Sequence, residues 1–383
     1  MPTTPTGSTT ATGTASATDS KPATTSATSG VDATGTTGLA PAEYRDLAPG
    51  YLNTATLGIA PARATAAVHA ALDDWSAGRP ATEAYEEAVA AARAAFARIV
   101  NVPVTQVALA GTVAGAVGLI AAALPPGAEV VTYEADFSAL VHPFAARPDL
   151  DLRLVPLEAV ADAVRPTTAL VAVSSVQSAD GRIADLAAIR AAAAAHGART
   201  LIDATQSAGW LPLDASLYDY VVCHGYKWLT SPHGAAFLTV APDAESTLAP
   251  TSTGWYAAAD PYASPYGPIT TLAPGARRFD ARPSALSFVA AAQSLALIEE
   301  LTIPRIHAHT TALATRLRTG LTALGHHPLP TPSAIVAVPD APTLATRLAA
   351  TPLTFSTRAN NLRFAPHFYN SEADIDALLN AAS

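Results

Sequence analysis

The sequence has 383 residues, of which 50% are hydrophobic and 14% are charged, and its formal net charge is −9. This length is enough for a large core and favours two domains. The acidic balance, with no basic run longer than Arg277-Arg278, argues against binding to nucleic acids. The single cysteine, Cys223, excludes a disulfide framework and a multi-cysteine metal site, and it favours a reducing, cytoplasmic location. We expect no metal.

The N-terminal segment differs in composition from the rest of the chain. Residues 1–40 are rich in Thr, Ser, Ala and Gly and predict a disordered tail, because they cannot bury enough apolar surface to become ordered. Further on, the uncharged stretch from Val107 to Leu124 approaches the length of a membrane span. Gly111-Thr112 interrupts it, so a strand, a turn and a buried helix explain it better, and we expect no contact with a membrane.

Predicted helices and strands alternate along the next part of the chain. Helices are expected at 63–79, 84–99, 113–124, 137–144, 157–164, 186–196, 284–301, 306–324, 342–350 and 372–380. Strands are expected at 106–110, 129–133, 152–156, 169–174, 200–202, 220–222 and 236–240, with two short ones at 334–338 and 362–365. Apolar strands that alternate with helices predict an α/β fold with a mainly parallel seven-stranded sheet, covered on both faces.

The predicted elements fall into three parts after the tail. Residues 41–60 are expected to form an N-terminal segment that joins the small domain. Residues 61–270 are expected to form the large domain with the seven-stranded sheet, and residues 271–383 a small C-terminal α/β domain. In an open α/β sheet, binding sites lie beyond the carboxyl ends of the strands. The residues that follow each predicted strand are therefore the candidates for chemistry.

The stretch from His224 to Leu229 is the strongest of these candidates. It follows a buried strand, and its lysine stands between aromatic residues, Tyr226 and Trp228. An amine that is fixed and partly desolvated in this way is suited to forming a Schiff base. Lys227 is also the only lysine outside the tail, which holds Lys21. We therefore predict that Lys227 carries pyridoxal 5′-phosphate (PLP).

Two other strand ends offer groups that a bound PLP requires. Asp203 ends a strand, where a carboxylate would keep a pyridine nitrogen protonated, although a helix cap explains this aspartate equally well. Gln206, three residues later, could reach the phenolic oxygen of the ring. At Gly111-Thr112 a strand turns into a helix whose first N–H groups and dipole favour a phosphate. Alone, such a Gly-Thr turn is usually structural.

Arg363 adds a fourth place, on a short strand of the second predicted domain. Its guanidinium fork is suited to holding an α-carboxylate, although an isolated arginine more often forms a surface ion pair. In order and spacing, the four places resemble the class V aminotransferase family. This family has the three-layer PLP-dependent transferase fold (fold type I) and includes cysteine desulfurases, isopenicillin N epimerase-like proteins and kynureninases. The resemblance covers about residues 45–383.

The resemblance implies three groups of residues around the cofactor and the substrate. Those implied to bind the phosphate are Gly111, Thr112, Val113, His224 and Tyr226. Those implied to lie near the ring are Phe137, which would stack on it, and Ser175, Asp203, Gln206 and Lys227. Those implied to hold the substrate carboxylate are Asn53 and Arg363. Trp255 resembles part of a loop that the partner subunit contributes, which implies a homodimer with the active site at its interface.

The resemblance also implies an enzyme that acts on an amino acid, with Lys227 moving the proton at Cα. An aminotransferase or a β-eliminating carbon–sulfur lyase is expected, and the alternatives are an amino-acid epimerase and a kynureninase-like hydrolase. A persulfide-forming cysteine desulfurase is disfavoured because Cys223 lies in an apolar strand. From other classes, a non-catalytic protein of this fold and a nucleotide-binding α/β enzyme are alternatives, but neither glycine-rich nucleotide fingerprint is present.

Overall fold

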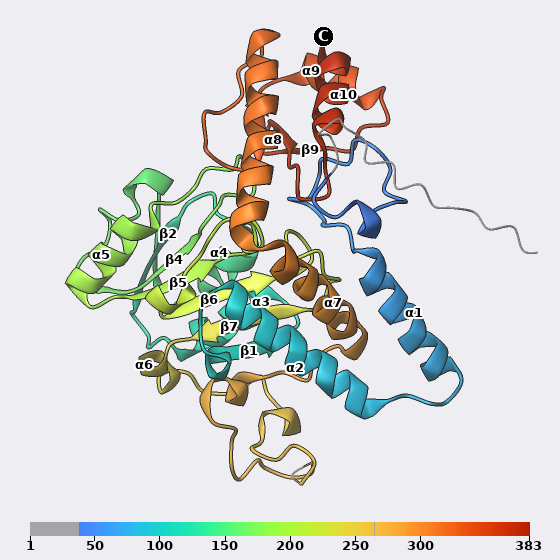
Figure 1. Cartoon of the computed structure of the whole chain (residues 1–383). Coiled ribbons are helices and arrows are strands. Elements are labelled where there is room, and N and C mark those ends of the chain that lie inside the picture. Colours follow the sequence, from blue (N-terminus) through green and yellow to red (C-terminus); the bar gives the residue numbers. More distant parts are fainter. Residues whose placement is uncertain (1–37, 264) are drawn as a thin grey trace, which may run out of the picture. The chain divides into compact units, whose positions relative to one another are not determined.

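The computed structural model describes residues 38–263 and 265–383, so residues 1–37 of the predicted tail lie outside the described residues. Its largest sheet has seven strands in the order β1-β7-β6-β5-β4-β2-β3 (Figure 1). These strands are β1 (Val107–Ala110), β2 (Glu129–Tyr133), β3 (Asp151–Val155), β4 (Thr168–Ser174), β5 (Arg199–Asp203), β6 (Tyr220–His224) and β7 (Ala236–Val240). Only β7 pairs antiparallel with its neighbours, and the other neighbouring strands are parallel. The mainly parallel seven-stranded sheet is confirmed.

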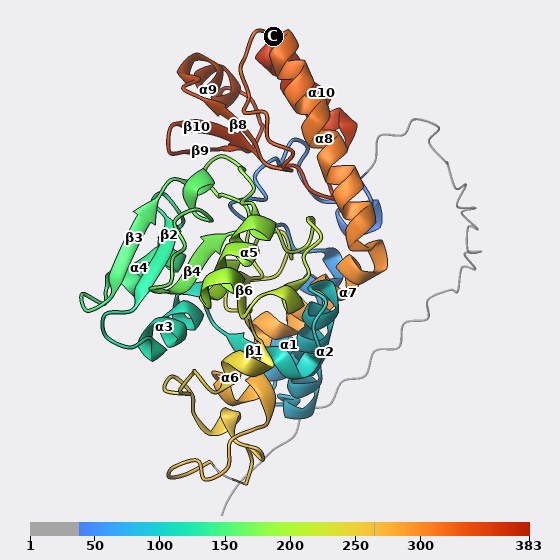
Figure 2. The same cartoon turned by 90° about the vertical axis from the view of Figure 1, so that its left-hand side faces the viewer.

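Helices cover both faces of this sheet (Figure 2). They are α1 (Ala62–Ser76), α2 (Thr82–Ile99), α3 (Val113–Ala123), α4 (Ser138–Ala145), α5 (Leu186–His196), α6 (Pro242–Glu245) and α7 (Ala285–Leu301). Side chains alternate along each strand, so Val107 and Leu109 of β1 pack on the side of α2, α5 and α7, while Ala108 packs on the side of α3 and α4. The result is a three-layer α/β/α arrangement, as expected.

A second, three-stranded antiparallel sheet has the order β8-β10-β9. It and its helices comprise α8 (Ile303–Ala323), β8 (Val336–Pro339), α9 (Pro342–Ala349), β9 (Ser356–Arg358), β10 (Asn361–Phe364) and α10 (Glu372–Ala382). The N-terminal segment joins it: Leu52 is buried in this second core, and its N–H donates to the Thr354 carbonyl at 2.8 Å. Helix α7 lies in the range 271–383 that was expected to form the small domain. It packs instead against α1 and α2, which belong to the large domain.

Several details differ from the expected elements, and the short helix α6 is one that was not expected. The helix predicted at 157–164 is wrong, because only a 3-10 turn forms there, at Leu157–Ala159. Arg165 precedes a proline, which disfavours helical backbone at Arg165. The Ala163 carbonyl accepts a hydrogen bond from the Arg153 guanidinium and not from a backbone N–H of a longer helix. The short strand β9 was not predicted. The other 3-10 helices are Pro41–Glu43, Val104–Gln106, Ala215–Leu217, Trp255–Ala257 and Gly275–Phe279.

In the part of the chain that the structure describes, no single helix is both long and apolar enough to cross a bilayer. Helices α7 and α8 meet the criteria of length and composition only when taken together, and they are bent by 82° relative to each other.

Candidate active site

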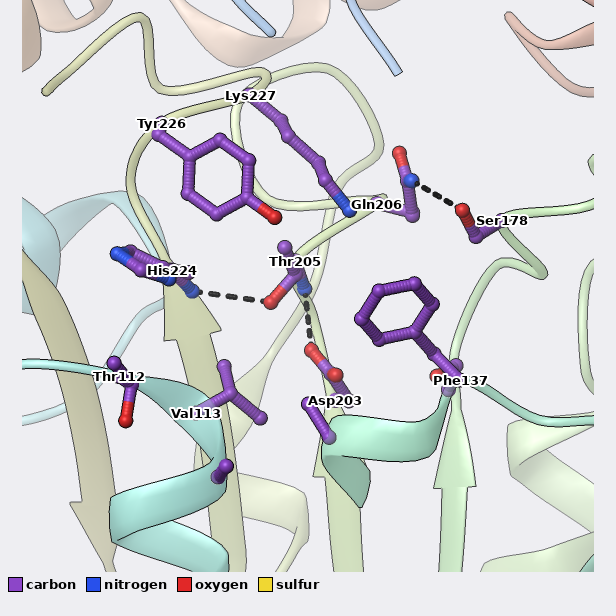
Figure 3. A pocket seen from close by; sticks show the side chains of 13 residues that line it. Thr112, Val113, Phe137, Ser178, Asp203, Thr205, Gln206, His224, Tyr226 and Lys227 are labelled. Carbon is purple, nitrogen blue, oxygen red and sulfur yellow. Dashed lines mark hydrogen bonds between the residues drawn. The ribbon is translucent and has the colours of Figure 1, made fainter. Parts of the chain in front are cut away.

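The carboxyl ends of β4, β5 and β6 and the start of α3 surround a cavity of about 260 Å³ (Figure 3). It lies at the edge of the sheet where the strand arrangement predicts a site. Its lining residues are Thr112, Val113, Ala114, Phe137, Ala139, Ser174, Ser178, Asp203, Thr205, Gln206, His224, Tyr226 and Lys227. Three segments far apart in sequence, near residues 112, 205 and 226, thus meet in one place.

Lys227 lies in the turn that follows β6, and only 4% of its surface is exposed. Its side chain points into the cavity beside Phe137 and Tyr226 (Figure 3). The Nζ atom lies 5.1 Å from the ring centroid of Phe137 and 5.4 Å from that of Tyr226. Burial disfavours the charged ammonium and lowers the pKa of Lys227 to about 8, while the Asp203 carboxylate opposes this shift. With this pKa, about one tenth of the amine is unprotonated at pH 7, far more than for an ordinary lysine, and the unprotonated amine is the form that a nucleophile or general base requires.

The backbone around Lys227 is held by contacts from three other segments. The Gly58 N–H donates to the Tyr226 carbonyl at 2.8 Å. The Trp228 indole N–H donates to Gln206 Oε1 at 2.8 Å, and His367 Nε2 donates to the Trp228 carbonyl at 2.8 Å. Burial lowers the pKa of His367 to about 3, so this ring is neutral and serves as a donor. These contacts fix the position of the lysine.

Gly58 provides a specific test of this support. A Cβ added there would lie 1.8 Å from the carbonyl oxygen of Lys227, so one of the two backbones would have to move. We expect Gly58→Ala to lower the free energy of unfolding by about 1–3 kcal/mol, as overpacking does, and to weaken cofactor binding. Urea unfolding of the cofactor-free protein and a cofactor titration measure the two effects.

Gly118 on α3 gives a matched control for that substitution. A Cβ added to Gly118 would meet no atom within 4 Å, and alanine favours a helix over glycine. Gly118→Ala should therefore leave stability unchanged or raise it. Equal stability and equal cofactor affinity for Gly58→Ala and Gly118→Ala would contradict the tight contact between Gly58 and Lys227.

Asp203 ends β5 at the base of the cavity and is 4% exposed. Its Oδ1 accepts a hydrogen bond from the Thr205 N–H at 2.8 Å, and it forms no ion pair with any described residue. Burial raises the pKa of Asp203, whereas the bonds from Thr205 and the charge of Lys227 oppose the shift. A buried carboxylate that forms no ion pair within the described part of the chain is suited to a cationic group on a ligand.

Phe137 is positioned by the residue before it. Asp136 accepts hydrogen bonds from the Phe137 N–H at 2.7 Å, from the Ser174 N–H at 2.8 Å and from the Ser174 hydroxyl at 2.5 Å. Phe137 itself is 45% exposed, with its ring beside the Lys227 amine. An aromatic ring fixed in this way offers a flat surface to a planar ligand.

The α3 N-terminus faces the cavity from the opposite side. The Thr112 hydroxyl accepts from the Gly115 N–H at 3.0 Å and so caps the helix, while Val113 and Ala114 begin it beside the cavity. His224 is also on this side, where its Nε2 accepts from the Gly234 N–H at 3.2 Å. Burial lowers the pKa of His224 to about 4. The first N–H groups of a helix and its dipole favour an anion, so this side of the cavity is suited to a phosphate.

Gln206 and Arg363 are connected through Ser178. The Gln206 amide nitrogen donates to the Ala55 carbonyl at 2.9 Å and to the Ser178 hydroxyl at 3.0 Å. Arg363 also donates to that hydroxyl, at 3.1 Å, and to Thr56 Oγ1 at 2.7 Å. Arg363 is 1% exposed, so a predicted surface ion pair is excluded for it. All its partners among the described residues are neutral, which leaves its charge without a carboxylate.

Several predicted site residues do not line the cavity. Ser175 needs a correction: its hydroxyl bonds with Ser207 Oγ at 2.6 Å and with the Asp203 carbonyl at 3.1 Å, beneath the cavity. Gly111 precedes the cavity wall and lines a neighbouring hollow. Asn53 bridges to Ala365, and its Oδ1 is buried without a partner. Trp255 lies apart, with the Arg282 guanidinium 4.8 Å from its ring.

Four functional positions were missed from the sequence. Thr205 lies within the Asp-x-x-Gln motif, so the motif could have indicated it. Its hydroxyl accepts a hydrogen bond from the His224 N–H at 3.0 Å. Ser174, Ser178 and Thr56 carry no motif, and only the fold brings them together. Among the described residues, no group of three or more His, Cys, Asp or Glu is arranged to hold a metal.

Comparison with known proteins gives a family match and several relatives. The model of the aminotransferase class-V family matches residues 61–338. The uncharacterised aminotransferase YcbU of Bacillus subtilis (strain 168) is 27% identical over 307 residues, which cover 74% of this chain and 80% of the relative. The isopenicillin N epimerase of Streptomyces clavuligerus is 33% identical over 183 residues, which cover 43% of this chain and 46% of the epimerase.

Solved structures give the same fold. A cystine C–S lyase, C-DES, in complex with cysteine persulfide has a TM-score of 0.79 at 24% identity, and the match covers 88% of this chain and 98% of that one. The cysteine desulfurase CsdA of Escherichia coli has a TM-score of 0.75 at 20% identity, covering 89% and 97%. The predicted family resemblance and fold class are confirmed.

Proposed function

The chain belongs to the class V aminotransferase family, whose members use PLP, and we propose that it is an enzyme that holds PLP on Lys227 and converts an amino acid by transamination or β-elimination. The observation that carries this proposal is the buried amine of Lys227, with its pKa near 8, in one cavity with the buried Asp203 and the ring of Phe137. When bound, PLP withdraws electrons from the Cα of an attached amino acid and makes its proton acidic.

The residues of the cavity fit this cofactor. The N-terminus of α3 supplies N–H groups for a phosphate, with His224 and Tyr226 beside it. Asp203 forms no ion pair with the residues that the structure describes, which suits a protonated pyridine nitrogen. Phe137 offers its ring for stacking. PLP requires a lysine, an acid and N–H groups for its phosphate in one cavity. Lys227, Asp203 and the start of α3 offer these groups here.

Gln206 has a more restricted role than the resemblance implies. Both protons of its amide nitrogen are already donated, to Ala55 and Ser178, and its oxygen accepts from Trp228. It would therefore reach a phenolic oxygen of the cofactor only by giving up one of these bonds. We therefore assign Gln206 mainly to positioning Trp228, the residue after Lys227. Contact with the cofactor is its secondary role.

The substrate is held and deprotonated by separate groups in this proposal. Arg363 binds the α-carboxylate, because its fork is buried and lacks a carboxylate partner among the described residues. Asn53, which the resemblance assigns to the same carboxylate, does not line the cavity, and its buried Oδ1 has no partner among the described residues. Lys227, once released, takes the proton from Cα. The atom to which Lys227 would then give this proton would decide between transamination and β-elimination.

Epimerisation is less well supported because it requires a second base. Three histidines lie near the lysine segment, and of these His367 is fully buried and bonded to the Trp228 carbonyl. His224 has its Nε2 engaged by the Gly234 N–H, and His233 is stacked on Tyr226 with ring centroids 4.0 Å apart. Lys227 is therefore the base that the cavity offers, and one base suffices for transamination or β-elimination.

Cys223 tests whether a persulfide takes part. Its thiol is fully buried, and burial raises its pKa, so it lacks the thiolate character of a sulfur acceptor. We expect Cys223→Ala to retain turnover within about twofold and to cost about 1 kcal/mol of stability through a small cavity. Steady-state rates with cysteine and cystine measure this. Loss of sulfide release from cysteine, with normal folding and cofactor content, would point to a cysteine persulfide instead.

A homodimer and a cytoplasmic location are also proposed. Trp255 lies away from the cavity of its own chain, and Tyr262 and Tyr266 of the same loop are 61% and 92% exposed. A loop with several exposed aromatic residues is suited to contact with another subunit. Light scattering on the purified protein tests the dimer. The location rests on the single cysteine of the sequence.

The reaction class is tested by incubating the holoenzyme with amino acids and cysteine conjugates. Pyruvate with ammonia would indicate β-elimination, and amination of an added keto acid would indicate transamination. A change of optical rotation alone would indicate epimerisation, and cleavage of kynurenine would indicate the hydrolase. Normal cofactor binding without any product would favour the non-catalytic alternative. A thermal-shift comparison of PLP with NAD and ATP separates the nucleotide-binding alternative.

A further inference from the structure

One face of the three-stranded sheet carries two arginines. In the pairing of β9 with β10, Asn361 is opposite Arg358 and Arg363 is opposite Ser356. Side chains alternate between the faces of a sheet, so Arg358 and Arg363 share one face. Leu362 of β10 points to the other face, where it is buried in the core of this second sheet. The hairpin thus places both cations on the side away from that core.

The two guanidinium groups meet at one hydroxyl. Arg363 Nη2 donates to Thr56 Oγ1 at 2.7 Å, and Arg358 Nη2 lies 3.5 Å from the same oxygen. Arg363 is buried, whereas Arg358 is exposed. The Nη1 atom of Arg358 donates to the carbonyl of its neighbour Thr357 at 2.9 Å. Arg358 therefore lies on the solvent side of Arg363.

No described carboxylate compensates this pair of charges, since neither arginine forms an ion pair within residues 38–263 and 265–383. Burial and the charge of Arg358 lower the pKa of Arg363 to about 10, and Arg358 also contributes to the lowered pKa of Lys227. Two adjacent cations without a protein anion are stabilised when an anionic ligand binds between them. One α-carboxylate occupies the buried fork, which leaves the outer fork for a second anion.

We propose that Arg358 binds a second acidic group of the substrate, so that the enzyme selects amino acids with a carboxylate in the side chain. This inference rests on the proposed function, because it requires Arg363 to hold the α-carboxylate. The outer guanidinium then recognises the distal carboxylate through charge-assisted hydrogen bonds. A neutral side chain of the same length gains no such contact.

The test compares matched amino acids on the holoenzyme by titration of the cofactor spectrum. The pairs are glutamate with glutamine and aspartate with asparagine. The wild-type protein should bind the acidic member of at least one pair more tightly. Arg358→Gln should weaken the binding of that member about tenfold, as expected for a charge-assisted hydrogen bond, and leave its neutral partner unchanged. Arg358→Lys should restore part of the preference.

Arg305 on α8 provides the matched control, because it is exposed and its replacement by Gln makes the same change of charge. Arg305→Gln should leave all four affinities unchanged. Equal weakening of the acidic and neutral members in Arg358→Gln would assign Arg358 to the α-carboxylate and overturn the proposal, as would no weakening or no preference in the wild-type protein. A wild-type spectrum that responds to no amino acid would contradict the proposed function itself.

Discussion

Replacing Lys227 by alanine should lower turnover by about 10³-fold or more, because the same amine carries the cofactor and moves the proton at Cα. Its position in the cavity, beside Phe137 and above the buried Asp203, leaves no other amine within the described residues to take over either task. Steady-state rates on the best amino acid, with the protein saturated with PLP, measure the loss.

The stability of this variant separates chemistry from folding. Burial lowers the pKa of Lys227, so the lysine carries a desolvation cost that alanine lacks. The Tm of the cofactor-free Lys227→Ala protein should therefore equal that of the wild type or exceed it. Lys21→Ala, at the other lysine of the sequence, is the control and should retain full activity. Turnover within tenfold of the wild type would disprove the role of Lys227.

Replacing Asp203 by asparagine should lower turnover by about 10²-fold or more, because a neutral amide no longer keeps a pyridine nitrogen protonated. The two side chains have nearly the same shape, and asparagine still accepts the hydrogen bond from the Thr205 N–H. The raised pKa of Asp203 shows that burial penalises its charge, so the Tm of the cofactor-free protein should not fall. Rates and Tm are measured on the same preparations.

Asp136 offers a contrast to Asp203, because it is half-buried and acts as a structural acceptor. Its carboxylate takes bonds from Phe137 and Ser174. Asp136→Asn disturbs these hydrogen bonds. It is the comparison for Asp203→Asn, because it makes the same change of side chain at an acid that is not expected to contact the pyridine nitrogen. If Asp203→Asn kept normal turnover, the carboxylate would have no part in the chemistry, and a helix cap would suffice to explain it.

Much of the large sheet could be predicted from the sequence, because its strands are short apolar runs separated by helices. The alternation of Val107, Ala108 and Leu109 between two cores shows why such runs are buried on both faces. The helix expected at 157–164 forms only a 3-10 turn at Leu157–Ala159, and the Arg153 guanidinium donates to the Ala163 carbonyl beyond that turn. The apolar spacing of the sequence does not reveal the contact between Arg153 and the Ala163 carbonyl.

The candidate site was predictable only where a residue belongs to a strand end with a motif. Lys227, Asp203 and Gln206 could be identified in this way, and the structure brings all three to one cavity. Ser178 and Thr56 could not, since they come from loops whose only signal is their hydrogen bonds to Arg363. The engagement of Gln206 by Trp228 was likewise invisible, because it depends on the fold around a neighbouring turn.

The central claim is that Lys227 holds the cofactor, and borohydride reduction of the purified holoenzyme tests it most directly. Reduction fixes the cofactor to the amine that carries it, and peptide mapping by mass spectrometry then identifies the residue. We predict one modified peptide that contains Lys227, and no modified peptide in Lys227→Ala. A cofactor fixed to Lys21, or a protein that shows no reducible cofactor after saturation with PLP, would contradict the account.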